Sequence, residues 1–257
     1  MSDFDRNYAT ATRGVGAGRA AVIDAGLRAY MIRVYNYMAM GVALTGVVAW
    51  LTFNAAVTET AGRLALTPFG QMVYSGPAVI VLFLATLGLV FLISWRINSL
   101  TPSTALTLFM VYAALLGVML STVFLTYTHT SIARVFFISA ASFGALSLWG
   151  YTTQRDLSAM GAFLIMGLFG LILAMVVNFI LAMFGVNTGP LDFIISCIGV
   201  LVFAGMTAWD TQRIKNMYDA MDDGTIAGRK AVMGALSLYL DFINLFLFLL
   251  RLLGDRR

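Results

Sequence analysis

The chain has 257 residues, of which 60% are hydrophobic and only 11% are charged, and its formal net charge is +4. Soluble domains usually carry about 25% charged residues, so this composition excludes a sizeable soluble domain and predicts a membrane protein with several spans. The small positive charge does not indicate nucleic-acid binding, because charged residues in such proteins mainly set topology. Cys197 is the only cysteine, which excludes an intramolecular disulfide and a cysteine-based metal cluster.

The first 30 residues are polar and rich in Gly and Ala, and they contain four arginines. They include no apolar core of the kind found in a cleavable signal peptide. We therefore expect residues 1–30 to form a flexible cytosolic tail and residues 31–257 to form one bundle. The tail's arginines are interpreted as orientation signals, and a handle for a partner protein is the alternative.

Seven apolar segments follow, and each is long enough for a helix to cross a hydrocarbon core of about 30 Å. In lipid the backbone must satisfy its own hydrogen bonds, so helices are the only form expected at these lengths. The fold class is therefore predicted to be an all-α polytopic membrane protein with seven transmembrane helices. The expected bounds are 35–53, 78–95, 105–127, 135–151, 160–184, 193–210 and 231–253.

Lysine and arginine are distributed unevenly between the two predicted sides of the membrane. With the N-terminus inside, 11 of the 16 basic residues are cytosolic: Arg6, Arg13, Arg19, Arg28, Arg33, Arg96, Arg155, Arg213, Lys215, Arg229 and Lys230. This bias predicts a cytosolic N-terminus and, with seven spans, a C-terminus outside. Arg256 and Arg257 argue the other way, and one re-entrant segment would place the C-terminus inside.

Two carboxylates stand out within or beside apolar segments. Asp210 ends the sixth segment in AWDTQRIKN, and Asp241 lies about ten residues into the seventh in LYLDFINLF. A carboxylate at the bilayer centre costs about 2.5–3.5 kcal/mol on insertion scales, so each is expected to face the bundle interior or a water-filled cavity. Ser237, Asp241 and Asn244 share one face of the seventh helix, and Thr207 shares a face of the sixth with Asp210.

Both acids approach the cytosolic half of the predicted bundle, where they would face each other. Like charges a few ångströms apart cannot both ionise cheaply, so such a pair tends to hold one proton. Protonation would then switch a hydrogen-bonded contact between two helices, and the deprotonated oxygens would suit a hard cation such as calcium. The alternative is a buried polar contact that only fixes the helix register.

Arg96 ends the second segment in ISWRIN, on the same predicted side as the acids. Its guanidinium would pair with Asp210 and compete with the contact between the two carboxyl groups. The alternative is a snorkelling arginine that only sets topology. The sequence contains no phosphate-cradling glycine loop and no histidine cluster, so no tightly bound cofactor is expected.

Three stretches of the chain are distinctive: WGYTTQRDLS at 149–158, FAGMTAWDTQRIKN at 203–216 and GALSLYLDFINLFLFLLRLLG at 234–254. They resemble the Bax inhibitor-1/YccA family, also called the transmembrane Bax inhibitor motif family, and its bacterial members in particular. The resemblance runs from about Arg28 to the C-terminus and departs at Trp209, where a tyrosine is usual. It implies six helices around a central seventh, and a di-aspartyl pH sensor formed by Asp210 and Asp241 that controls a calcium leak. It also implies a latch arginine, for which Arg96 is the best match.

The leading prediction is a pH-sensitive calcium leak channel or transporter-like protein of the bacterial inner membrane. Calcium would be the permeant ion, with Asp210 and Asp241 as its possible ligands. The alternative is an interaction protein, because some bacterial relatives bind the membrane protease FtsH through a cytosolic tail. An intramembrane aspartyl protease is less favoured, since it needs a GxGD turn where this chain has Leu238-Tyr239-Leu240. We therefore expect no enzymatic activity, a lipid environment, no nucleic-acid partner and, by default, a monomer.

Overall fold

The computed structural model describes the backbone of residues 3–60 and 63–257, and the side chains of 24–58 and 64–257. Seven helices in the described residues are long and apolar enough to cross a membrane, which confirms the seven predicted segments. They are α1 (Asp3–Ala56), α3 (Gly76–Arg96), α4 (Pro102–Leu120), α6 (His129–Thr152), α7 (Ser158–Met183), α8 (Gly189–Asn216) and α9 (Gly224–Leu253).

Most of these helices extend beyond their predicted bounds because polar residues cap them outside the apolar windows. The side chains of Ser75, Thr101 and Thr128 accept backbone N–H groups in the first turns of α3, α4 and α6. Asp223 does the same for α9, which therefore begins seven residues before the predicted start at residue 231. Such caps satisfy N–H groups that a helix leaves without an internal partner. Hydropathy alone does not register them.

Two local features were not predicted. Strands β1 (Val57–Thr60) and β2 (Arg63–Leu66) form an antiparallel pair after α1, and the short helix α2 (Pro68–Val73) follows. The predicted third segment is also interrupted, because α4 ends at Leu120 and a separate turn, α5 (Val123–Thr126), completes the crossing. Ser121 lies at this break and shares a 2.9 Å hydrogen bond with the hydroxyl of Tyr74.

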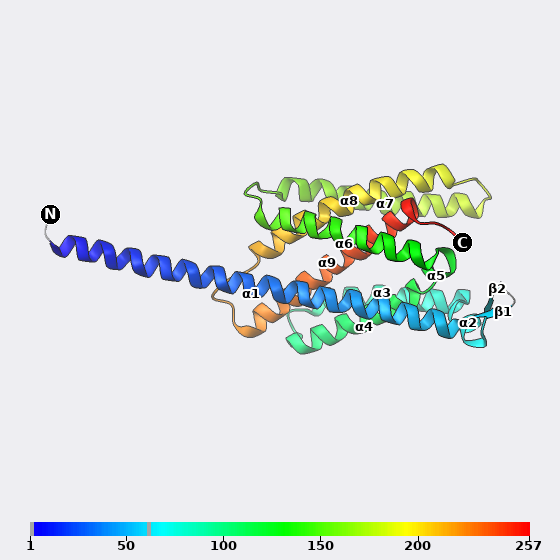
Figure 1. Ribbon diagram of the computed structural model, residues 1–257, viewed down its shortest axis with the longest axis horizontal. Coiled ribbons are helices and arrows are strands. Elements are labelled where there is room, and N and C mark those ends of the chain that lie inside the picture. The colour runs from blue at the N-terminus through cyan, green and yellow to red at the C-terminus, as the bar shows by residue number, and fades with distance from the viewer. Residues whose placement is uncertain (1–2, 61–62) are drawn as a thin grey trace.

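The spans form two layers with α9 between them. Figure 1 shows α1, α3 and α4 on one side and α6, α7 and α8 on the other, with α9 crossing obliquely between the two groups. Four helices pack extensively on α9, namely α1, α4, α6 and α8. The outer helices α3 and α7 pack instead on α4 and α8. The expected ring of six helices around the seventh is therefore not confirmed.

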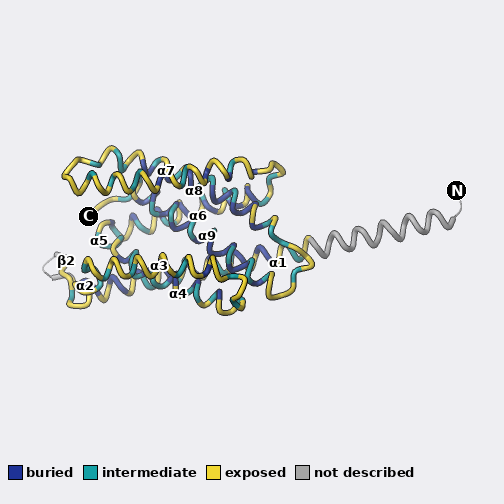
Figure 2. Tube along the Cα trace, turned by 180° about the vertical axis from the view of Figure 1, so that it is seen from behind, coloured by how far each residue is buried: buried dark blue, intermediate teal, exposed yellow. Residues whose placement is uncertain are grey.

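Helix α9 is nevertheless the most buried span in the described residues. Its apolar window is 72% buried, compared with 44% for α8, and Figure 2 shows buried residues concentrated along it. Leu238, Tyr239 and Leu245 are almost fully enclosed. The segment that carries Asp241 is thus the core of the bundle.

Residues just before the predicted boundary at residue 31 already pack against the bundle. Leu27 packs against the main core and Tyr30 is buried, with its ring 5.6 Å from that of Tyr218 in the loop 217–223. We call the end of the bundle that carries this loop the α8–α9 loop end. The predicted flexible tail falls mainly on residues whose side chains lie outside the described part, so it stays a prediction.

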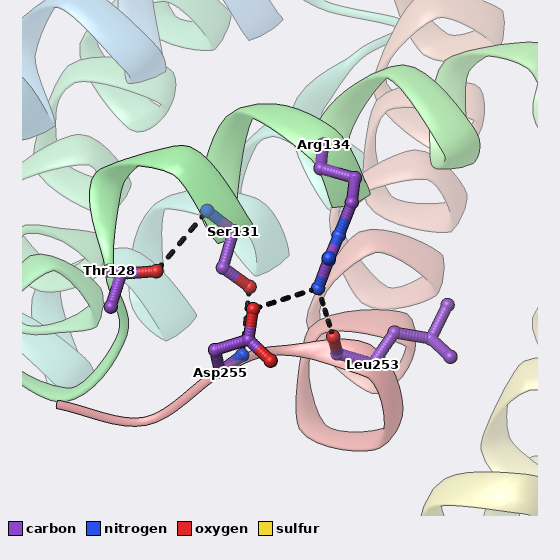
Figure 3. A network of polar contacts seen from close by, with 5 residues as sticks. All are labelled: Thr128, Ser131, Arg134, Leu253 and Asp255. Atoms are coloured by element: carbon purple, nitrogen blue, oxygen red, sulfur yellow. Dashed lines mark hydrogen bonds and ion pairs between the residues drawn. The ribbon is translucent and has the colours of Figure 1, made fainter.

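At the opposite end, a C-terminal strap formed by residues 255–257 lies across the start of α6 (Figure 3). Arg134 donates hydrogen bonds of 3.0 Å to the carbonyl of Leu253 and to the carboxylate of Asp255. The backbone N–H of Asp255 donates to the hydroxyl of Ser131 at 2.8 Å. Its carbonyl accepts from the backbone N–H of Thr128 at 3.1 Å. The strap therefore joins the end of α9 to the start of α6.

Candidate functional site

Close antiparallel packing of α8 and α9 places the two acids at a similar depth. A Cβ added to Gly199 on α8 would lie 2.7 Å from the ring of Phe248 on α9. A Cβ added to Gly234 on α9 would lie 3.0 Å from the side chain of Ile214 on α8. Asp210 and Asp241 both lie between these contact points along their helices. Glycine at the two crossings is thus what lets the acid-bearing faces approach.

The structure brings Asp210 and Asp241 into direct contact. Their carboxyl groups lie within hydrogen-bonding reach of each other, and the residues are only 5% and 3% exposed. Ionised carboxylates only accept hydrogen bonds, so this contact needs a proton on one of them. Asp210 Oδ1 and Asp241 Oδ2 have no hydrogen-bond partner in the described part of the chain. The pair is therefore placed to share a proton, and two of its buried oxygens accept no hydrogen bond within the described residues.

Asp210 lies deeper than its predicted place at the end of the sixth segment. Helix α8 continues through TQRIKN to Asn216, so about two further turns of helix follow the acid. The polar residues after Asp210 made that extension invisible to hydropathy. Because α8 continues past Asp210, this acid lies inside the helix and not at its end, at a depth similar to that of Asp241.

The cation nearest the pair is Arg213, which the sequence analysis did not select. Its Nη1 lies 3.7 Å from Asp210 Oδ1, and its guanidinium lies 5.4 Å from the ring centroid of Trp209. The distance is that of an ion pair and too long for a hydrogen bond. The three-residue spacing from Asp210 places both on one helix face, so the sequence contained this signal.

Arg96 is not paired with Asp210 in this structure. It is exposed at the end of α3, and none of the ion pairs within the described residues includes it. The physical reason is the layered arrangement, because α3 packs on α4 while α8 lies in the other layer beyond α9. The expected competition with the Asp–Asp contact is therefore absent here, and a latch role for Arg96 stays a prediction.

The predicted supporting polar residues serve their own helices. Thr207 donates to the carbonyl of Phe203, and Asn244 donates to that of Leu240, each at 2.8 Å. Ser237 makes no hydrogen bond to either carboxyl group within the described part. Thr207, Asn244 and Ser237 therefore make no hydrogen bond to the acids within the described residues, and their supporting role stays a prediction.

A chain of hydroxyl groups beside the acids was not predicted. Tyr35 on α1 is hydrogen-bonded to Ser147 on α6 at 2.7 Å, and Ser147 is hydrogen-bonded to Thr211 on α8 at 2.9 Å. Thr211 directly follows Asp210 and is fully buried. The chain joins three helices at the level of the acid pair, and only tertiary structure reveals it.

The segment after Asp210 also holds the loop between α6 and α7. Gln212 accepts a hydrogen bond from the backbone N–H of Leu157 and donates one to the carbonyl of Arg155, both at 2.8 Å. Lys215 donates to the carbonyl of Tyr151 at 2.8 Å. Two of the three distinctive sequence stretches, 149–158 and 203–216, therefore bind each other.

Asp156 lies in this loop, outside the membrane spans. The hydroxyl and the backbone N–H of Ser158 donate to its carboxylate and lower the pKa of Asp156 from the ordinary value of 3.8. The carboxylate of Asp156 is fully solvated and is separate from the acid pair. Its contact with Ser158 helps to shape the start of α7.

The acid pair alone does not make a complete calcium site. Calcium takes 6–8 oxygen ligands, and two carboxyl groups supply four at most. No cluster of three or more His, Cys, Asp or Glu side chains with metal-site geometry occurs in the residues searched, namely those that the structure describes. Arg213 also places positive charge beside Asp210. The described residues could contact a hydrated divalent ion but do not form a complete cage.

Comparisons with known proteins give the same family that the three distinctive stretches resemble. A family model described as "Inhibitor of apoptosis-promoting Bax1" matches residues 27–257. Inner membrane protein YbhL of Escherichia coli K12 is 45% identical over 236 residues, which cover 91% of this chain and 94% of that protein. An uncharacterized protein, RP147, of Rickettsia prowazekii is 42% identical over 257 residues, and one of Caulobacter vibrioides is 40% identical over 259 residues. Each of these two alignments covers 100% of both chains.

Proposed function

Because the chain belongs to the Bax inhibitor family, we propose that this membrane protein is a pH-sensitive calcium leak of the bacterial inner membrane. The observation that carries the proposal is the contact between two buried carboxyl groups, Asp210 and Asp241. These acids lie on α8 and α9, the helices with the most extensive mutual packing. A change of charge at this contact therefore acts on the centre of the bundle.

The gating step is the loss or gain of the shared proton. With one proton, a hydrogen bond joins the carboxyl groups and supports the packing of α8 on α9. Without it, two unit charges 4 Å apart repel by about 4 kcal/mol at an effective dielectric constant of 20. That is comparable with the total effect of a severe core mutation, so ionisation is strong enough to shift helix packing.

Arg213 would offset part of this repulsion. Its guanidinium lies within ion-pair distance of Asp210, and its side chain is 57% exposed, so solvent screens the attraction. An ionised Asp210 would draw closer to Arg213, and Asp241 would keep its own charge without a cationic partner. We infer that Asp241 supplies the charge that attracts a permeating calcium ion.

Two other functions have weaker support. Binding to FtsH would require the N-terminal tail, whose side chains lie mainly outside the described residues. Intramembrane proteolysis would require accessible backbone near the second acid, but α9 is a continuous helix from Gly224 to Leu253. Leu238 and Tyr239, just before Asp241, are fully buried. We propose neither activity.

Calcium flux into dye-loaded proteoliposomes tests the leak directly. Wild-type protein is expected to show a flux that changes between about pH 6 and 8. Asp241→Asn should lose that pH dependence, because an amide can donate to Asp210 at any pH and carries no titrating proton. Asp219→Asn, an exposed acid in the α8–α9 loop, is the matched control and should behave as wild type. A wild-type pH profile in Asp241→Asn would refute the sensor, and no flux in wild type would refute the leak.

A further inference from the structure

A long apolar groove separates α1 from α6. Its volume is about 750 Å³, and its walls are one face of each helix. Phe242, the residue after Asp241, belongs to its lining, as does Phe143, whose ring lies 5.6 Å from that of Phe242. Both walls pack on α9 but not extensively on each other. The groove is therefore a built feature of the layered fold.

Small residues keep the groove open. Ala39 and Ala43 lie on the α1 wall, and Ala140 and Gly144 lie on the α6 wall. A Cβ added to Gly144 would meet no atom within 4 Å. A larger side chain at this position could therefore occupy the groove without displacing atoms of the protein.

The groove opens sideways at the depth of the lipid chains. Ile32 and Leu148 line it and are 49% and 63% exposed. Arg28 and Ala43 are 15 positions apart, which is about 22 Å of helix, and the hydrocarbon core is about 30 Å thick. The groove thus runs from one interface past the bilayer middle, which matches an acyl chain in length and polarity.

Only one end of the groove is polar and charged. Arg28 lies there with Tyr151, Tyr35 and Ser147, at the α8–α9 loop end of the bundle. The lining contains no acid. A guanidinium binds phosphate oxygens through paired N–H donors, and tyrosine hydroxyls commonly lie at the membrane interface. The chemistry at this end fits an anionic phosphate headgroup.

We propose that the groove between α1 and α6 binds one phospholipid with a net negative headgroup. One acyl chain lies along Gly144 and Phe242, and the phosphate lies at Arg28. By the positive-inside bias this lipid comes from the cytosolic leaflet. The site does not depend on the calcium-leak proposal, because lipid retention can be measured without any flux.

Native mass spectrometry of the purified full chain, titrated with palmitoyl-oleoyl phosphatidylglycerol or phosphatidylcholine, tests this site. Wild type is expected to retain one phosphatidylglycerol about tenfold more tightly than phosphatidylcholine. Gly144→Leu fills the groove and should weaken phosphatidylglycerol binding by about tenfold or more. Gly170→Leu on α7 is the matched control, because that position is also free of atoms within 4 Å but lies outside the groove. Ala43→Leu on the opposite wall is a second blocking variant.

The headgroup is tested separately. Arg28→Gln should abolish the preference for phosphatidylglycerol, while Arg33→Gln, an exposed arginine of α1 outside the groove, should keep it. Undiminished phosphatidylglycerol retention in both blocking variants would overturn the site. An unchanged preference in Arg28→Gln would overturn the assigned headgroup position. A wild-type dimer that the blocking variants convert to monomer, without loss of lipid, would show that a second copy occupies the groove.

Discussion

Replacing Gly117 by alanine should force α4 away from α1. A Cβ at this position would lie 2.7 Å from the backbone oxygen of Thr45 and 2.9 Å from the Cβ of Val48. Ordinary contacts begin at 3.4 Å, so the two helices must separate by about 0.7 Å, the difference between 3.4 and 2.7 Å. Backbone atoms cannot rotate out of the way, so the helices themselves have to move.

This shift has a second consequence through the side chain of Thr45. Its hydroxyl lies 2.9 Å from the carbonyl oxygen of Ala113 and 2.6 Å from the hydroxyl of Tyr239. A separation of 0.7 Å carries the first contact to about 3.6 Å, beyond hydrogen-bond range. Overpacking costs about 1–3 kcal/mol and a lost hydrogen bond about 1 kcal/mol. Alanine returns about 0.5–1 kcal/mol of helix propensity, so the net loss is about 1–3 kcal/mol.

The single cysteine provides the assay. Cys197 is half-buried in α8, so a thiol-reactive dye reports unfolding of the detergent-solubilised protein as its thiol becomes exposed. A loss of about 1–3 kcal/mol lowers the melting temperature by roughly 3–10 °C for a chain of this size. Gly88→Ala on α3 is the control, because no atom lies within 4 Å of its added Cβ. It should melt at or slightly above wild type. Equal melting temperatures for the two variants would refute the packing argument.

Three further predictions concern polar contacts. Gln212→Ala removes a buried side chain with two loop hydrogen bonds, so it should cost about 1–3 kcal/mol in the same assay, and a wild-type melting curve would contradict this. Asp255→Asn should speed amide hydrogen exchange in the C-terminal strap. It should barely change the melting temperature, because the Asp255 and Arg134 side chains are 66% and 54% exposed. Unchanged hydrogen exchange in the strap would contradict this prediction. The carboxyl of Asp156 should titrate below 3.8 by NMR, and Ser158→Ala should raise that midpoint. This contact between Asp156 and Ser158 is present above pH 3.8 and is lost as the pH falls through the lowered pKa, so equal midpoints would argue against it.

Hydropathy predicted the spans well because every span must be a helix that is long and apolar enough to cross the lipid. It placed the bounds poorly where polar residues belong to the helix, as with TQRIKN after Asp210 and TIAGRK before Ala231. It also missed the break at Ser121, because apolar residues run up to Leu120 and resume at Val123. The order of the chain does not specify which spans pair, so the two layers around α9 emerged only from the structure.

The acid pair could be predicted because a carboxyl group in a membrane span costs free energy unless it finds a polar partner. Asp210 and Asp241 lie on consecutive helices, so each can serve as the partner of the other. The three-residue spacing between Arg213 and Asp210 is visible in the sequence, whereas the position of Arg96 at a segment end indicates only its side of the membrane. Arg96 is not paired with Asp210 in this structure, because its helix belongs to the other layer, and its latch role stays a prediction. The hydrogen-bond chain through Ser147 and Thr211 could not be predicted, since hydroxyl groups are common in membrane helices and usually bond to their own backbone.

The buried acid on α9 also bears on how the helix enters the membrane during synthesis. Inserted alone, α9 would expose Asp241 to lipid at a cost of about 2.5–3.5 kcal/mol. The short loop 217–223 lets α8 and α9 leave the insertion channel together as a hairpin, with Asp241 already against Asp210. Glycosylation mapping of nascent chains should show poorer insertion of α9 alone than of the α8–α9 hairpin, and equal insertion would contradict this. The contact between Asp210 and Asp241 would then also be needed for membrane insertion, because α8 and α9 would have to insert together.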